Sequence, residues 1–278
     1  MPLFLALASS VVFGAADFTG GLATKRSPAV SVVVATYVTG LSVALLAVPF
    51  FGEGVPQVEH LLWGAGAGIA GGLGLVVLFH ALATTRMNVA APAAALFGAI
   101  APIGFGILTG ERPTALAWLG IAVALPAVAL LGAGNEDDAA RSTARRALLL
   151  AAVVGIGFGT FGIMISRTPA EAGMWPLVAA RVGSVIVIGA IAAGTGRPLW
   201  PRKAWRLALL SGAIDMVSNI LFLLAVRETL LSLVVVITSL YPASTIVLAR
   251  MVVGERLTRH QMAGLALGTV GVVLISVA

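Results

Sequence analysis

Five ionisable residues fall inside long apolar runs of this sequence. They are Asp17, His80, Arg181, Asp215 and, near the end of its run, Arg250. An ionisable group in the hydrocarbon core of a bilayer is costly, so such residues usually face a cavity or a partner and mark functional positions. The chemistry that they predict is the binding of a charged or polar solute, or the transfer of a proton, inside a membrane.

Arg181 and Asp215 are spaced so that their side chains can meet. Arg181 lies about 9 residues into its run, and Asp215 lies about 11 residues before the end of the next, antiparallel run. At a rise of about 1.5 Å per residue, both lie about 14 to 16 Å from the same membrane face. One interpretation is a buried ion pair, because a lone arginine in lipid costs more. The other is that Arg181 binds a substrate carboxylate or phosphate, with Asp215 as its resting partner or as a proton-coupling residue.

Polar residues near this pair extend the predicted site. Asp215, Ser218 and Asn219 have the i, i+3, i+4 spacing that places side chains on one helical face. The next run carries several hydroxyls around Pro242, which either contact a substrate or satisfy backbone groups that the proline leaves unpaired. The predicted substrate-binding residues are Tyr37, Arg181, Asp215, Ser218, Asn219 and Tyr241.

Two further residues are candidates for carrying a proton. Burial of Asp17 would disfavour its charged form, although a hydrogen bond to a neighbouring helix is an equal alternative. Histidine as a residue type is a common proton carrier, but His80 lies near the end of its run, which favours an interfacial structural role. The predicted proton-coupling residues are Asp17, His80 and Asp215.

The composition indicates that these residues sit in a polytopic membrane protein. The chain has 278 residues, of which 59% are hydrophobic and 10% charged, and its mean hydropathy is +1.06. That leaves too little polar surface to face water on all sides. The chain contains no cysteine, which excludes thiol catalysis and disulfides, and we expect no metal site and no cofactor. The net charge is +6, but the basic residues gather in short connections, which favours contact with lipid headgroups over nucleic acid.

Runs of about 20 apolar residues, each long enough to cross a bilayer, recur along the whole chain. They are rich in Ala, Leu and Gly and lack the alternation of barrel strands, so we expect an all-α fold of about ten transmembrane helices. The predicted spans are 3–23, 29–51, 61–83, 88–108, 114–133, 146–166, 172–194, 205–226, 230–252 and 259–277.

A repeated motif divides these spans into two sets of five. "GERPT" at 110–114 and "GERLT" at 254–258 differ by an offset of 255 − 111 = 144, and the surrounding sequence aligns at the same offset without a gap. We therefore predict two repeats, 1–139 and 140–278. A unit with an odd number of spans places its copy upside down in the membrane, so the two form an inverted repeat around a central cavity. Tyr37 aligns with Arg181, which makes that cavity asymmetric.

The repeated motif itself is predicted to be structural. Glu111 and Glu255 precede helix starts, where a carboxylate gains from the positive end of the helix dipole. Thr114 and Thr258 are expected to be N-caps, the second within a capping box. The predicted structural residues are Glu111, Thr114, Pro242, Glu255, Thr258 and Gln261.

These features resemble the EamA-type transporters of the drug/metabolite transporter superfamily. The resemblance rests on a proline-bearing helix ("SLYPAST", 239–245), an apolar run, "GERLT" and a glycine-rich last span, in a ten-span chain with a duplicated layout. It implies that the first four helices of each half surround the cavity while the fifth and tenth are peripheral, and that members export small metabolites, amino acids or toxic compounds, often against protons. Gly98 stands where the second half has Pro242, so family roles in the fourth span transfer less safely.

The sequence therefore predicts a secondary active transporter and not an enzyme, because an inverted repeat has two nearly equivalent packings that open its cavity to opposite sides. The expected cargo is a small organic metabolite, amino acid or drug-like compound, moved in the direction of export with proton coupling. An intramembrane enzyme acting on a lipid-linked substrate is the alternative. We expect a multi-pass protein of the cell membrane, such as a bacterial inner membrane, that is a monomer or a homodimer. The distribution of Lys and Arg predicts that both termini lie outside the cytoplasm.

Overall fold

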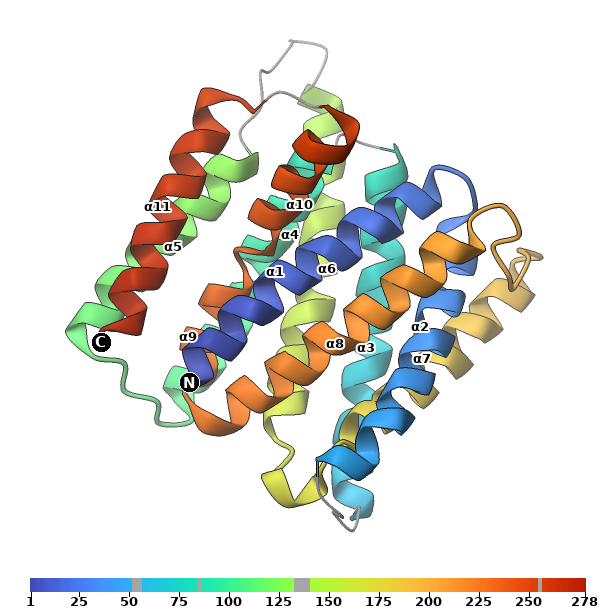
Figure 1. Cartoon of the computed structure of the whole chain (residues 1–278), viewed down its shortest axis with the longest axis horizontal. Coiled ribbons are helices and arrows are strands. Elements are labelled where there is room, and N and C mark those ends of the chain that lie inside the picture. The colour runs from blue at the N-terminus through green and yellow to red at the C-terminus, as the bar shows by residue number, and fades with distance from the viewer. Residues whose placement is uncertain (52–56, 85–86, 133–140, 255–256) are drawn as a thin grey trace.

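The fold is built entirely from helices in the part of the chain that the structure describes. The structure is a computed structural model that describes residues 1–51, 57–84, 87–132, 141–254 and 257–278, and no strand occurs in these ranges (Figure 1). The helices are α1 (Pro2–Thr24), α2 (Ala29–Ala47), α3 (Val58–Thr84), α4 (Met87–Leu108), α5 (Ala115–Gly132), α6 (Arg141–Ser166), α7 (Trp175–Gly194), α8 (Trp205–Glu228), α9 (Leu231–Thr238), α10 (Tyr241–Leu248) and α11 (Arg259–Ser276).

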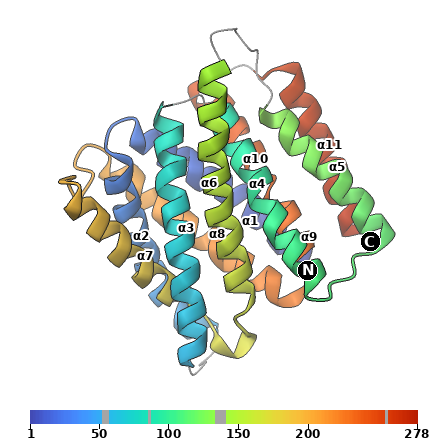
Figure 2. The ribbon, with the colours of Figure 1, turned by 180° about the vertical axis from the view of Figure 1, so that it is seen from behind.

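Most of these helices are long and apolar enough to cross a bilayer. Within the described ranges, 8 segments meet that requirement, and α5 is a shorter apolar helix. The last helix, α11, is not among them, and it begins with the polar residues Arg259, His260 and Gln261. Both termini lie at the same end of the bundle (Figures 1 and 2), as an even number of crossings requires. The prediction of an all-helical, multi-span membrane protein is confirmed.

The predicted span 230–252 is not one regular helix. α9 ends at Thr238, and α10 begins at Tyr241 with Pro242 in its first turn. Proline lacks an N–H group and clashes with the preceding turn, so the helix breaks before it. A turn of π-helix, Ala249–Val253, then leads to Gly254, whose positive φ of 79° suits glycine. The corresponding helix of the first half, α4, is continuous (Figure 2).

The helices pack mainly on helices from the other half of the chain. α1, α8 and the broken α9–α10 helix form one bundle, and α6, α3 and α4 form a second. The pairs α2–α7 and α5–α11 flank these bundles on opposite sides (Figure 1). A shift of 144 residues relates each helix of one bundle to a helix of the other. The two predicted repeats are therefore interleaved, and neither forms a bundle of its own.

Close contacts at glycines recur with the same offset. A Cβ atom on Gly68 of α3 would lie 1.9 Å from the carbonyl oxygen of Ala180 on α7. A Cβ atom on Gly212 of α8 would lie 2.2 Å from the carbonyl oxygen of Thr36 on α2. Adding 144 to 68 and to 36 gives 212 and 180. Only glycine allows the backbones to approach this closely, and each contact has its counterpart in the other bundle.

The α5–α11 pair shows how the corresponding helices are oriented. Gly120, early in α5, lies against Gly271, late in α11, while Gly264, early in α11, lies against Ala127, late in α5. The two helices are thus antiparallel, which is the arrangement that an inverted repeat gives. The predicted boundary between residues 139 and 140 falls at the edge of a range that the structure does not describe, and it stays a prediction.

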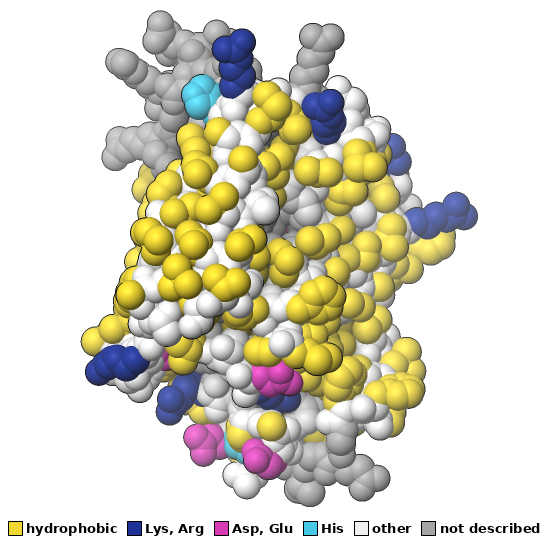
Figure 3. Space-filling model, turned by 60° about the vertical axis from the view of Figure 1, so that its left-hand side comes forward, with side chains coloured by type: hydrophobic (Ala, Val, Ile, Leu, Met, Phe, Trp, Pro, Cys, Tyr) yellow, Lys and Arg dark blue, Asp and Glu magenta, His cyan; other side chains and the backbone are white. Residues whose placement is uncertain are grey.

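The outer surface of the helices is apolar. Figure 3 shows hydrophobic side chains over most of the visible face, with Asp and Glu confined to its lower end. Large exposed side chains along the helices include Leu46, Ile100, Ile156, Ile186 and Val273. A surface of this kind is too apolar and too continuous for water and fits the hydrocarbon of a bilayer.

Candidate substrate cavity

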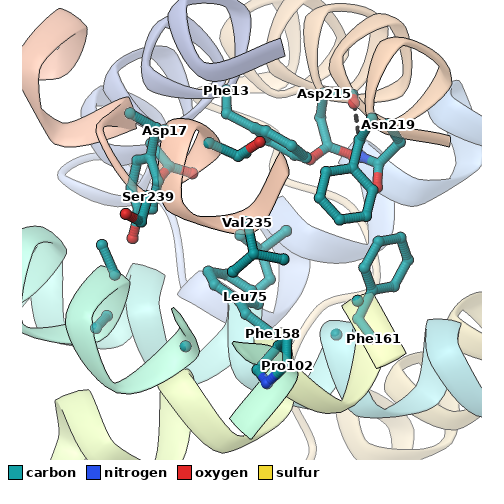
Figure 4. Close-up of a pocket in the computed structure, with 18 of the residues that line it drawn as sticks. Phe13, Asp17, Leu75, Pro102, Phe158, Phe161, Asp215, Asn219, Val235 and Ser239 are labelled. Carbon is teal, nitrogen blue, oxygen red and sulfur yellow. Dashed lines mark hydrogen bonds between the residues drawn. The ribbon is translucent and has the colours of Figure 1, made fainter. Parts of the chain in front are cut away.

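A cavity lies between the two bundles. The empty space between its lining residues is about 850 Å³ when the space open to the outside is included. Figure 4 shows side chains from both bundles around it. The polar side chains that line it are Asp17, Tyr37, Arg181, Asp215, Asn219, Thr238, Ser239 and Tyr241. The structure therefore brings together most of the residues predicted to bind substrate, along with Asp17.

Arg181 and Asp215 form a buried ion pair in this cavity. Nη2 of Arg181 lies 2.5 Å from Oδ2 of Asp215, and the two residues are 3% and 8% exposed. The guanidinium carbon also lies 4.5 Å from the centroid of the Tyr37 ring, a cation–π contact. A Cβ atom on Gly40 would lie 3.1 Å from Nε of Arg181, so glycine leaves room for this side chain. A substrate carboxylate would have to compete with Asp215 for this arginine.

Tyr37 and Arg181 have a special place in the fold. They differ by 144 residues, so they are counterparts in the two predicted repeats, and they touch each other. Counterparts can touch only close to the axis that relates the two copies. This pair therefore lies close to the axis, near the middle of α2 and in the first half of α7, and it shows that the copies differ in chemistry where they meet.

Asn219 and Ser218 follow Asp215 on α8 but have different positions. Asn219 lines the cavity, and its Nδ2 donates to the backbone carbonyl of Asp215 at 2.7 Å. Ser218 does not line the cavity: its hydroxyl donates to the same carbonyl at 2.7 Å. The carbonyl of Ser218 accepts from the hydroxyl of Ser9 on α1 at 2.9 Å. In this arrangement Ser218 joins α8 to α1, and its predicted substrate role stays a prediction.

The hydroxyls of α9 and α10 that line the cavity donate to backbone carbonyls. Tyr241 donates to Ala91 of α4 at 3.1 Å and so connects the two bundles. Thr238 and Ser239 donate within their own helix, to Val234 and Val236, at 2.7 Å in each case. Of the two predicted roles for these hydroxyls, the structure shows hydrogen bonding to the backbone beside the break at Pro242.

The candidates for proton transfer lie in different surroundings. Asp17 is 7% exposed and lines the cavity, and its carboxylate has no hydrogen-bond or ion-pair partner in the described part of the chain. His80 is exposed near the end of α3 and does not line the cavity, and both of its predicted roles stay predictions. Arg250 is exposed as well.

The two predicted N-caps have the expected geometry. The hydroxyl of Thr114 accepts from the backbone N–H of Ala117 at 3.1 Å. Thr258 accepts from the N–H of Gln261 at 3.2 Å, while the Gln261 side chain accepts from the N–H of Thr258 at 3.0 Å, which completes a capping box. Each threonine satisfies a donor that would otherwise be unpaired at a helix start.

Glu111 caps a different helix from the one predicted. Its carboxylate accepts from the backbone N–H groups of Leu231 at 2.7 Å and Ser232 at 3.0 Å, at the start of α9. The sequence predicts that Glu111 stabilises the start of α5. The structure corrects this prediction, because the carboxylate caps α9, which is one of the helices that line the cavity. Gly106 permits the contact, since a Cβ atom there would lie against the Glu111 carboxylate. Glu255 lies outside the described residues.

Sequence reasoning missed the opposite wall of the cavity, which is apolar. All residues of α3, α4 and α6 that line the cavity within the described ranges are apolar or glycine. Several of these apolar residues lie 144 positions before or after a polar lining residue, so the repeat offset would have identified them. Besides Tyr37 with Arg181, the pairs of counterparts that both line the cavity are Asp17 with Phe161, Asp215 with Gly71, Asn219 with Leu75, Thr238 with Ala94 and Ser239 with Ala95.

Comparisons with known proteins agree with this architecture. The model of the EamA-like transporter family matches the chain twice, over residues 1–133 and 145–277. A search of curated proteins found no match. A solved crystal structure has a similar fold, with a TM-score of 0.72 at 17% identity, over 97% of this chain and 98% of the other. The protein is thus a multi-pass membrane transporter, and the chain belongs to the EamA-like transporter family of the drug/metabolite transporter superfamily.

Proposed function

We propose that the protein is a secondary active transporter that carries a small organic solute through this cavity by alternating access, in the direction of export across the cell membrane. The observation that supports this proposal most strongly is that counterparts from two interleaved bundles line one cavity. A pair of inverted repeats, 1–139 and 140–278, can adopt two arrangements of similar energy, in which the bundles exchange their contacts. Each arrangement would open the cavity to a different side.

The interleaving indicates which parts move. Because α1 packs with α8 and α10, and α6 packs with α3 and α4, each bundle contains helices from both repeats. We expect the bundles, rather than the repeats as encoded, to rock against each other. The α2–α7 and α5–α11 pairs lie across the axis and would serve as the connections about which the bundles turn.

Asp17 is the residue that we propose for proton coupling. A buried carboxylate without a partner is costly, so it favours the binding of a proton or of a positively charged group. A residue that binds a proton when the cavity faces one side and releases it on the other side would couple transport to the proton gradient. Asp215 is less suited, because Arg181 already balances its charge.

Growth and exchange experiments test this function. Cells that overexpress the protein would be grown with graded concentrations of toxic amino-acid analogues, organic amines and drug-like compounds, and tolerance to at least one class is expected to rise. The protective compound would then be tested in proteoliposomes. Counterflow of the labelled compound supports a carrier, whereas a chemically altered compound supports the alternative of an intramembrane enzyme. Flux that neither saturates nor exchanges would indicate a channel.

A further inference from the structure

We infer that the solute is an organic cation with an apolar body. The geometry assigns its protonated amine to Asp17 and its hydrocarbon part to the wall formed by α3, α4 and α6. This inference rests on the proposed transport function and names the substrate class of the same cavity.

The first step concerns charge. Among the residues that the structure describes, two carboxylates and one guanidinium line the cavity, and Arg181 and Asp215 neutralise each other across 2.5 Å. Tyr37 covers the guanidinium. Asp17 is left as a buried acid without a partner in the described residues. A solute that fills the cavity excludes water from Asp17, so the charge of its carboxylate is then compensated by a bound proton or by a cationic group of the solute.

The second step concerns hydrogen bonds. The hydroxyl hydrogens of Thr238, Ser239 and Tyr241 are already donated to backbone carbonyls. A hydroxyl has a single hydrogen but two lone pairs, so these groups can offer a solute only their oxygen atoms. Asp17 and Ser239 lie on the same side of the cavity (Figure 4). This side is therefore rich in acceptors and suits a group with several N–H donors, such as an ammonium group.

The third step concerns the opposite wall. Phe158, Phe161 and Pro102 lie across the cavity from Asp17 (Figure 4). Beside them the wall is formed by small residues, which leave room for a hydrocarbon body; they are Gly71, Ala94, Ala95, Gly98 and Ala99. No side chain of this wall could pair with a second charged group of a solute, among the residues described. The body of the solute is therefore expected to be apolar.

An anionic solute fits this cavity less well. It would need Arg181, and binding it would leave Asp215 buried without its partner. It would also bring a negative charge into a cavity that Asp17 lines. The earlier alternative, in which Arg181 binds a carboxylate or phosphate, is therefore disfavoured.

Four small probes separate these contributions. Their binding to the purified full-length protein in lipid nanodiscs would be measured by calorimetry at pH 7. The probes are 2-phenylethylamine, the alcohol 3-phenylpropan-1-ol, the anion 3-phenylpropionate, and methylamine, which lacks the apolar body. We expect 2-phenylethylamine to bind most tightly, because it alone has both the ammonium group and the ring.

Two substitutions test the assigned contacts. Asp17→Asn is expected to weaken binding of 2-phenylethylamine by at least about tenfold, because a hydrogen bond to a charged group is lost, and to change binding of the alcohol little. Phe161→Ala is expected to weaken binding of the amine by removing part of the apolar wall. Glu228→Gln is the matched control, since Glu228 is an exposed acid outside the cavity. Asp17→Glu keeps the charge, and thermal unfolding shows whether each variant is folded.

The outcomes distinguish this inference from the proposed function. Equal or tighter binding of the anion or the alcohol overturns the inference, as does unchanged binding of the amine to a folded Asp17→Asn variant. Absence of saturable binding of the amine to the unsubstituted protein overturns it as well. If an anionic compound shows counterflow, the transporter stands and the substrate class is wrong. If the amine binds but no compound shows counterflow, the cavity is a binding site and transport is wrong.

Discussion

The cavity wall formed by α1, α8 and α9–α10 and the wall formed by α3, α4 and α6 have corresponding positions in the fold but opposite chemistry. The first wall carries Asp17, Asp215 and Asn219. Their counterparts on the second wall are Phe161, Gly71 and Leu75. Apart from the break before Pro242, the two walls share their helix arrangement, so one arrangement accommodates very different side chains facing the cavity. The two walls can therefore differ in the groups that they offer to a solute while their helices pack in the same way.

The close contacts between the bundles and the flanking α2 and α7 helices, in contrast, are alike beside the two walls. Gly68 against Ala180 and Gly212 against Thr36 are close backbone approaches of the same kind, one beside each wall. A larger side chain at either glycine would push the helices apart, whichever wall it belongs to. We therefore expect substitutions in the cavity to affect the two walls differently and substitutions at these contacts to affect them equally.

The first wall, with Asp17, Asp215 and Asn219, is called the polar wall. The largest effect is expected when the ion pair between its Asp215 and Arg181 of α7 is broken. Asp215→Leu leaves Arg181 buried without a partner, and such a loss costs about 3–5 kcal/mol of unfolding free energy. Arg181→Leu should cost less, because a carboxylate can bind a proton whereas a guanidinium cannot lose one. The double variant should be more stable than Asp215→Leu alone. Thermal unfolding of the purified variants checks this order, and counterflow is expected to be lost in all three.

A double variant no more stable than Asp215→Leu would contradict this prediction, because the cost would then not come from the unpaired charge. Normal counterflow in a folded Arg181→Leu variant would show that the pair is not needed for transport.

The next effect tests the part of the fold that the two walls share. Gly68→Ala and Gly212→Ala each place a Cβ atom about 2 Å from a carbonyl oxygen, and overpacking of this kind costs about 1–3 kcal/mol. The two losses are expected to be similar. Gly104→Ala and Gly189→Ala are matched controls, since a Cβ atom there meets nothing within 4 Å. These controls should be neutral or slightly stabilising, because alanine favours helix more than glycine does.

Stability in detergent, measured as the midpoint of thermal unfolding, compares these four variants directly. A large loss for one of the close-packed glycines and none for the other would show that the two flanking contacts are not equivalent.

A smaller effect is expected at Glu111, whose carboxylate caps α9, a helix of the polar wall. Glu111→Gln keeps one acceptor for the N–H groups of Leu231 and Ser232 but loses the charge and the second acceptor. A loss of about 1–2 kcal/mol is expected, similar to the loss of a strong helix cap. The measurement is the folded yield and thermal unfolding midpoint, with Glu171→Gln as an exposed control. Normal yield and stability together with abolished transport would instead assign Glu111 to the transport pathway.

Features that depend on neighbouring residues could be predicted from the sequence. The lengths of the apolar runs gave helices close to the observed bounds, because the length of a span follows from the helical rise and the bilayer thickness. The capping box at Thr258 and Gln261 depends on residues three positions apart. The meeting of Arg181 and Asp215 followed from their equal depth in adjacent spans.

Features that depend on tertiary packing could not be predicted in this way. Glu111 caps a helix that begins 120 residues later in the chain, and no local pattern indicates that partner. The interleaving of the repeats and the apolar wall around Phe161 also depend on how distant helices pack. The offset of 144 contained part of this information, because the counterpart of a polar cavity residue in one wall lines the cavity in the other.

The smallest effect is expected at the two N-caps, where the halves are again alike. Thr114→Ala and Thr258→Ala should each cost about 1 kcal/mol, because each removes an acceptor for one backbone N–H. The loss should be somewhat larger at Thr258, since Gln261 is held in the same capping box. Thr269→Ala is the control, because Thr269 is exposed and bonds only within α11. If Thr269→Ala lowers the unfolding midpoint as much as the two cap substitutions do, the lost stability comes from removal of a hydroxyl in general and not from loss of the cap.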